Sequence, residues 1–187
     1  MSSSAVKPTT ATTLQNLQTA FTGESNAQVR YAAFAKKADE EGFCQIASLF
    51  RAAARAEQIH AASHAAVIGK MGGKAEAEIQ TPVVKSTREN LAVAIAGEEH
   101  ERDVMYPDFI KEAEAQNNSA AVRTFHRALE AEAEHARLYK EGLAHIEQMK
   151  TKTAYYVCPI CGYTAERPTF DRCPICKNPR EKFETVD

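Results

Sequence analysis

The stretches that decide the fold are Glu57-Gln58-Ile59-His60 and Glu132-Ala133-Glu134-His135, two copies of the pattern E-x-x-H. Residues three apart in a helix lie on the same face, so each copy presents a carboxylate and an imidazole together. Three further glutamates, Glu24, Glu98 and Glu101, also fall on otherwise apolar helical faces. A glutamate from each of two helices, plus an E-x-x-H from each of the other two, is the ligand set of a dinuclear metal site inside a four-helix bundle.

Four amphipathic patterns predict the helices that carry these residues, because their apolar positions recur every three or four residues. The apolar stripes run through residues 14–31, 46–67, 91–109 and 125–146, and the last part of the third stripe is Glu98, Glu101, Met105 and Phe109. Burying five carboxylates without compensation would be prohibitively costly, and two divalent metal ions would make it tolerable. The sequence therefore predicts a mainly α protein built on a bundle with a buried metal pair.

The connections between the predicted helices differ in length. Short turns at residues 41–42 and 117–119 join the first helix to the second and the third to the fourth, whereas residues 69–86 form a much longer link. One long crossover between the second and third helices indicates a ferritin-like topology. Ser86 and Ser119 are the predicted N-caps of the third and fourth helices. Pro107 is expected to kink or loosen the third helix just beyond its ligands.

After Lys150 the composition changes to cysteine, proline and aromatic residues. Two C-P-I-C pairs predict a four-thiolate metal site in a small module that depends on its metal to fold, with the ligands Cys158, Cys161, Cys173 and Cys176. Iron and zinc both suit such a site. The expected segments are a flexible leader at 1–12, the helical bundle at 13–150 and the cysteine module at 151–187. Cys44 is expected to be a small buried hydrophobe in the second helix.

Composition narrows the function classes further. The 187 residues carry 23 Lys and Arg against 25 Asp and Glu, which gives no sign of nucleic acid or of an anionic membrane surface as a partner. No apolar run approaches the ~18 residues that a membrane span needs. The first residues lack the apolar core of a secretory signal, and the cysteine pattern is that of a metal site. We therefore expect a cytoplasmic protein.

At these residues the chain resembles the rubrerythrin family. The resemblance lies in the order of the ligands, the strings Gly97-Glu98-x-x-Glu101 and Met105-Tyr106-Pro107, and the C-terminal rubredoxin-like module. It implies a non-haem di-iron peroxidase that reduces hydrogen peroxide to water in oxidative-stress defence, with electrons delivered through the iron of the four cysteines. It also implies an external rubredoxin or NAD(P)H-dependent reductase, and a homodimer in which one subunit's thiolate iron lies near another's di-iron site.

The same resemblance implies roles for single residues. Glu57 and Glu132 would bridge the two irons, Glu24 and Glu98 would be terminal ligands on opposite irons, and His135 would hold one iron permanently. The other iron would exchange Glu101 in the oxidised state for His60 in the reduced state. Tyr31 and Tyr106 match tyrosines near the family's site, so the implied catalytic residues are Glu101, His60, Tyr31 and Tyr106.

Several neighbouring residues have a plainer interpretation. His64, one turn after His60, is expected to be a hydrogen-bonded core residue and not a ligand. Glu99 and Glu134 lie beside ligands and should face elsewhere. Two rival functions remain open: a ferritin-like storage or ferroxidase protein, which would take up many irons, and a zinc-ribbon adaptor on a helical bundle, which would have no turnover.

Overall fold

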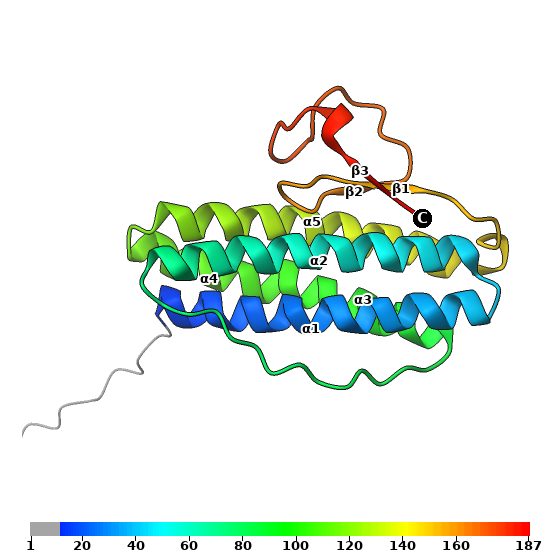
Figure 1. The fold of residues 1–187 in the computed structure, drawn as a ribbon, viewed down its shortest axis with the longest axis horizontal. Coiled ribbons are helices and arrows are strands. Elements are labelled where there is room, and N and C mark those ends of the chain that lie inside the picture. Colours follow the sequence, from blue (N-terminus) through cyan, green and yellow to red (C-terminus); the bar gives the residue numbers. More distant parts are fainter. Residues whose placement is uncertain (1–11) are drawn as a thin grey trace, which may run out of the picture.

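The computed structural model describes residues 12–187 and shows a long helical bundle with a small tail module on one side (Figure 1). The third helix of the bundle is divided by a π-helical segment, η1. The bundle consists of α1 (Thr13–Glu40), α2 (Cys44–Lys70), α3 (Thr87–His100), η1 (Glu101–Met105), α4 (Tyr106–Ala115) and α5 (Ser119–Ala144). This is the predicted mainly α, four-helix architecture. No helix among the described residues has the length and hydropathy needed to cross a membrane.

Side-chain caps define where the helices begin. The Ser86 hydroxyl accepts a hydrogen bond from the backbone N–H of Glu89, and the Glu89 carboxylate accepts one from the N–H of Ser86. The predicted cap of α3 is therefore confirmed. The prediction of Ser119 for α5 is wrong by one residue, because the Asn118 side-chain oxygen accepts from the N–H of Ala121 at 3.0 Å. The leader expected at 1–12 lies outside the described residues except for Thr12, which caps α1.

The long link between α2 and α3 crosses the bundle along the outer side of α1 (Figure 1). The side-chain amide of Asn26 in α1 makes two hydrogen bonds to this link. The amide nitrogen donates to Glu78 O at 3.0 Å, and the amide oxygen accepts from Gln80 N–H at 2.8 Å. The segment has no helix or strand of its own. The predicted ferritin-like crossover is therefore present.

The third helix loosens where Pro107 was expected to disturb it, but the disturbance begins earlier, at Glu101. The N–H of Tyr106 bonds to the carbonyl of Glu101, five residues back, which is the spacing of a π turn. The extra residue rotates the inward face by one position. Tyr106 and Ile110 are buried, while Met105 and Phe109 are only half-buried. Met105 and Phe109 still pack against the core, as predicted, but the fully buried positions are shifted by one residue.

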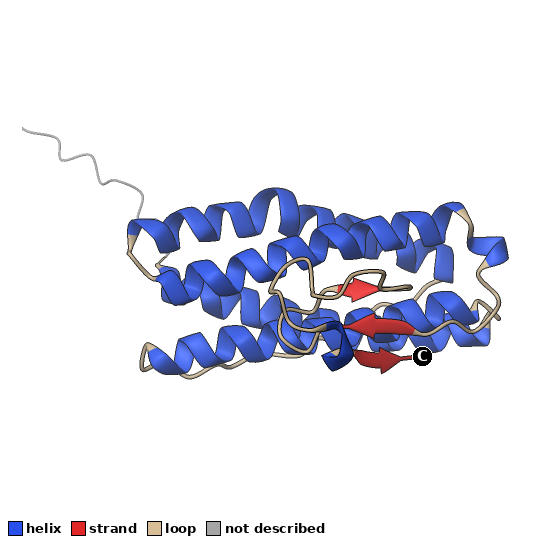
Figure 2. Ribbon diagram, turned by 90° about the horizontal axis from the view of Figure 1, so that it is seen from above, coloured by secondary structure: helices blue, strands red, loops and turns tan. Residues whose placement is uncertain are grey.

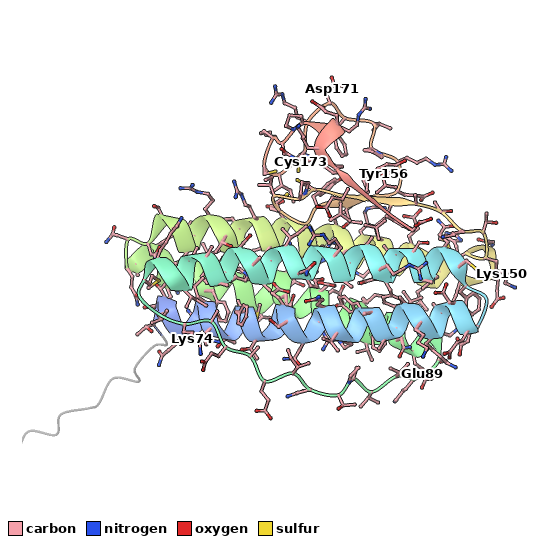
Figure 3. The ribbon with its side chains drawn as sticks, in the orientation of Figure 1. Lys74, Glu89, Lys150, Tyr156, Asp171 and Cys173 are labelled. Carbon is pink, nitrogen blue, oxygen red and sulfur yellow. The ribbon has the colours of Figure 1, made fainter. Side chains whose placement is uncertain are left out.

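The tail module turns back over the bundle after η2 (Ile146–Gln148). Its strands are β1 (Tyr155–Val157), β2 (Thr164–Ala165) and β3 (Glu184–Val186), with η3 (Arg180–Lys182) before the last strand. The strand order is β2-β1-β3, and both pairings are antiparallel. Figure 2 shows this small sheet lying over the helices. In Figure 3, Lys150 marks the end of the bundle where the chain reverses, and Cys173 lies in the module above the middle of the bundle.

The module is fastened to α2 of its own chain. Arg55 donates to both carboxylate oxygens of Glu184, at 2.6 and 2.9 Å, and Arg51 donates to Asp187 O at 2.8 Å. Tyr155 and Val157 of β1 are buried in the same apolar cluster as the inner residues of α1 and α2. Because the core is continuous across the junction, the module has a fixed place over the centre of the bundle.

Candidate active site

The four helices bring the predicted ligands into two overlapping clusters. The first contains Glu24, Glu57, His60 and Glu132, and the second contains Glu57, Glu98, Glu132 and His135. Within each cluster, one possible ligand atom from every residue lies within 4.8 Å of all the others. All these side chains are at most 2 % exposed. Glu57 and Glu132 belong to both clusters, so they stand between the two.

Both histidines point Nδ1 at the carboxylates. His60 Nδ1 lies 2.9 Å from Glu57 Oε2 and 2.8 Å from Glu132 Oε1, and His135 Nδ1 lies 2.7 Å from Glu132 Oε2. Their Nε2 atoms face the tail module instead. His60 Nε2 is 3.0 Å from the carbonyl of Cys161. A carbonyl only accepts hydrogen bonds, so Nε2 carries the proton and the lone pair of a neutral ring lies on Nδ1, directed into the cluster.

The metal-free cluster is electrostatically unfavourable. Burial and the neighbouring carboxylates of Glu132 and Glu24 raise the pKa of Glu57 to about 8. Burial, Glu132 and Glu57 likewise raise the pKa of Glu98 well above its usual value. Burial alone would also raise the pKa of Glu132, but the imidazoles of His60 and His135 outweigh it and lower that pKa. Burial and mutual repulsion therefore disfavour the charged form of several of these carboxylates when no metal is bound.

A pair of metal ions fits this arrangement. Glu24 Oε2 and Glu57 Oε1 are buried and have no hydrogen-bond partner among the described residues, which is costly unless a cation satisfies them. Carboxylate oxygens and imidazole nitrogens suit divalent iron or manganese. Two such ions would offset the charge that raises the pKa of Glu57 and Glu98. The donor set and the unpaired carboxylate oxygens thus both indicate a pair of metal ions.

Glu101 stands next to this site but outside both clusters. It is the first residue of η1 and is half-buried. Burial and the negative charge of Glu24, Glu132 and Glu57 raise its pKa well above the usual value. The structure therefore brings His60 together with Glu24, Glu57 and Glu132, and leaves Glu101 beside them.

The two predicted tyrosines each donate a hydrogen bond to a glutamate of the site. The Tyr31 hydroxyl donates to Glu98 Oε1 at 2.7 Å, and the Tyr106 hydroxyl donates to Glu24 Oε1. Burial, together with the nearby carboxylates, raises the pKa of both phenols well above the usual value. Both hydroxyls consequently keep their protons at neutral pH and act as donors.

His64 extends this contact away from the site. Its Nε2 lies 3.1 Å from the Tyr106 hydroxyl, and its Nδ1 lies 3.2 Å from the hydroxyl of Thr124. Tyr106 gives its proton to Glu24, so it accepts from His64 Nε2–H, and His64 Nδ1 then accepts from Thr124. A directed chain of hydrogen bonds thus runs from α5 to Glu24. The expectation that His64 is a hydrogen-bonded core residue is confirmed.

Sequence reasoning missed three residues at this site. Nothing in the sequence marks Thr124 as a site residue, because a threonine on a helix is usually an ordinary surface or core residue. Thr164 lies 3.1 Å from His135 Nε2 and is distant in the sequence. Tyr139 was on the predicted stripe but was given no role; its hydroxyl is buried without a partner, and its ring centroid is 5.6 Å from that of Tyr31.

The glutamates beside the ligands face elsewhere, as predicted. Glu99 pairs with Lys140 at 2.5 Å, and Glu134 pairs with Arg137 at 2.7 Å. Cys44 corrects another expectation, because it is half-buried at the first turn of α2 and not fully buried. A position at the very start of a helix leaves one side open to solvent.

The four cysteines of the tail module form the second centre. Cys158 Sγ and Cys176 Sγ are 3.5 Å apart, as are Cys161 Sγ and Cys173 Sγ. A tetrahedral metal with bonds of about 2.3 Å separates its sulfurs by about 3.8 Å, so the four thiols are close to a ligating arrangement. Cys176 is half-exposed, whereas the other three are buried. Cys161, whose carbonyl contacts His60 Nε2, is one of these four cysteines.

Comparison with known proteins agrees with this geometry. The family model "Rubrerythrin" matches residues 15–143, and "Rubrerythrin, rubredoxin-like domain" matches residues 156–184. Nigerythrin from Nitratidesulfovibrio vulgaris is 39% identical over 178 residues, which cover 95% of this chain and 88% of that protein. Rubrerythrin-2 from Clostridium acetobutylicum is 36% identical, with 93% of this chain and 96% of that protein covered.

Solved structures give the same result. A structure of nigerythrin in its fully reduced, all-ferrous state matches with a TM-score of 0.89 at 38% identity, covering 98% of this chain and 91% of the other. A bacterioferritin from Desulfovibrio desulfuricans shares the bundle fold, with a TM-score of 0.68 at 22% identity and coverage of 74% and 81%. The chain carries the glutamate and histidine ligands of a di-iron site and a rubredoxin-like four-cysteine site. It belongs to the rubrerythrin family.

Proposed function

We propose that this protein is a non-haem di-iron peroxidase that reduces hydrogen peroxide to water in oxidative-stress defence. The observation that carries the proposal is the contact between His60 Nε2 and the carbonyl of Cys161, 3.0 Å apart, which joins the two metal centres within one chain. Peroxide takes up two electrons and two protons, its O–O bond breaks, and two water molecules leave. The electrons come from an external donor, and the four cysteines would hold the iron that passes them on.

When bound, the iron pair supplies two electrons and Lewis acidity, and the thiolate iron supplies replacement electrons one at a time. Glu57 and Glu132 belong to both clusters, so they would be the ligands that two bound ions share. Glu24 and His60 lie on one side of them, and Glu98 and His135 on the other. The half-buried Glu101, beside the first cluster, would be the residue that exchanges with His60 as a ligand.

The surrounding residues position ligands and manage protons. Tyr106 donates to Glu24, and Tyr31 donates to Glu98, so each holds a terminal carboxylate in place and keeps a proton at the edge of the site. His64 and Thr124 supply the hydrogen bonds behind Tyr106. The ligands of both clusters are buried, which excludes bulk water from the reaction.

The wider setting of the reaction is also part of the proposal. We expect an external rubredoxin or NAD(P)H-dependent reductase as the electron donor, a homodimer, and a cytoplasmic location. The tail module lies on the bundle of its own chain, so the contact at His60 does not itself require a second subunit. Our proposal therefore includes electron transfer between the two centres of one chain.

The test is to compare oxidants. Reduced protein is mixed with hydrogen peroxide or with oxygen, and consumption of each is followed together with the iron content per chain. A peroxidase consumes peroxide faster than oxygen and keeps a constant iron content of three per chain. A storage protein, the rival suggested by the shared bundle fold, would prefer oxygen and accumulate iron. Zinc in the tail module, with neither peroxide nor oxygen consumed, would indicate the zinc-ribbon adaptor.

A further inference from the structure

A groove of about 770 Å³ lies between α5 and the tail module, and Cys176 forms part of its wall. Cys176 is the half-exposed member of the four cysteines, and the other three are buried. The groove therefore offers a solvent-side approach to the thiolate centre. Arg123 and Arg127 line the groove from α5, while Tyr163 and Ile175 line it from the module. We call this surface the cysteine groove.

The cysteine groove has a surplus of positive charge. Arg123 and Arg127 are one helical turn apart, and neither makes an ion pair within residues 12–187. Lys177, which follows Cys176, is exposed and lies beside the groove because its Nζ donates to Pro174 O at 2.7 Å. Of the two glutamates in the lining, Glu134 is neutralised by Arg137, which leaves only Glu130 to oppose three cations. This is a local feature, since the whole chain has a net charge of −2.

We propose that the cysteine groove is the docking site of the external electron donor, a small one-electron carrier protein with an acidic face. Opposite charges steer such a carrier to the groove and orient its redox centre toward Cys176. One electron then passes from the reduced carrier to the ferric thiolate iron, so the carrier is oxidised and the iron reduced. No bond forms or breaks and no proton moves. The inference rests on the proposed function in taking the thiolate iron as the point of electron entry.

The test uses the iron-loaded full-length protein and reduced flavodoxin, a small acidic flavoprotein. The rate constant for reduction of the thiolate iron is measured by stopped-flow without peroxide, so a failed peroxidase reaction cannot affect it. The variant is Arg123→Glu/Arg127→Glu. A control with the same charge change is Lys36→Glu/Lys111→Glu, on the exposed surfaces of α1 and α4. Binding of oxidised flavodoxin, followed by calorimetry at low salt, gives a second measurement that needs no electron transfer.

We expect the groove variant to lower the rate constant at low salt at least about tenfold, to flatten its salt dependence, and to weaken flavodoxin binding. The control should change these values much less. The milder Arg123→Gln/Arg127→Gln variant should give an intermediate rate. The proposal is overturned if the groove variant and the control slow reduction equally, because net charge alone would then explain the effect. It is also overturned if the groove variant dissociates an oligomer while reduction by flavodoxin is unchanged, since a second copy would then occupy the groove.

Discussion

Replacing Gly162 with alanine should disturb the junction between the two metal centres. The residue after the second cysteine of each C-P-I-C pair has a left-handed backbone: φ is 75° at Gly162 and 63° at Lys177. Because a lysine occupies this conformation in the second knuckle, the conformation alone does not require glycine. The neighbours differ. Lys177 is exposed, whereas Gly162 lies against the ring of His60.

The size of the effect follows from this contact. A Cβ at position 162 would lie 2.3 Å from His60 Nε2, while ordinary contacts begin at 3.4 Å. The ring and the knuckle must therefore separate by about 1.1 Å, which lengthens the 3.0 Å contact between His60 and Cys161 O beyond hydrogen-bond reach. Leaving a buried donor without its partner costs about 1–3 kcal/mol. For a chain of this size, each kcal/mol lowers Tm by roughly 2–4 °C.

Gly42→Ala is the matched control, because Gly42 has φ of 80° and no atom within 4 Å of an added Cβ. Both variants carry the same left-handed backbone cost of roughly 1–2 kcal/mol. We expect Gly162→Ala to have the lower Tm and, in anaerobic stopped-flow, slower electron transfer from the thiolate iron to the bundle, with an unchanged visible band. Equal Tm values and equal transfer rates in the two variants would refute the argument that this contact joins the centres.

Three further perturbations test other parts of the site. Tyr106→Phe removes the donor to Glu24 and should lower the free energy of unfolding by about 1–3 kcal/mol in denaturant titration. Tyr156→Phe should change it little, because the Tyr156 hydroxyl has no side-chain partner within residues 12–187. The raised pKa of about 8 at Glu57 means that the folded metal-free protein binds protons more tightly than the unfolded chain, so its Tm should fall as pH rises from 5 to 8. Bound iron replaces those protons, so the iron-loaded protein should not show this fall in Tm. The same fall in the iron-loaded protein would contradict the assignment of Glu57 as a metal ligand. Cys176→Ser should abolish the visible band and expose the tail module to protease while the bundle keeps its iron, whereas Cys44→Ser should leave the band intact.

Much of this architecture follows from spacing in the sequence. The E-x-x-H patterns and the glutamates on apolar stripes identify the helices and the faces that meet, because helical periodicity is a local property. The lengths of the links can also be read from the sequence, and the one long link predicts the crossover. Helical periodicity could not predict the π turn at Glu101. A helical wheel assumes a constant rotation per residue, so it predicted Met105 where the structure buries Tyr106.

Contacts between distant segments were the other part that the sequence did not reveal. The chain from Thr124 through His64 to Tyr106 joins α5, α2 and α4. Nothing near any one of these residues predicts its partners. The contact of Gly162 with His60 is similar, because the C-P-I-C-G string accounts for the knuckle but not for what lies against it. Such pairings arise from tertiary packing, which local patterns do not encode.

The most direct test of the central claim is a single-turnover experiment. The fully reduced protein is mixed anaerobically with one equivalent of hydrogen peroxide, and the visible band of the thiolate iron is followed by stopped-flow. Electron flow from the four-cysteine iron to a peroxide-reducing iron pair predicts rapid return of that band while peroxide is consumed. A band that stays bleached while peroxide persists would contradict the account.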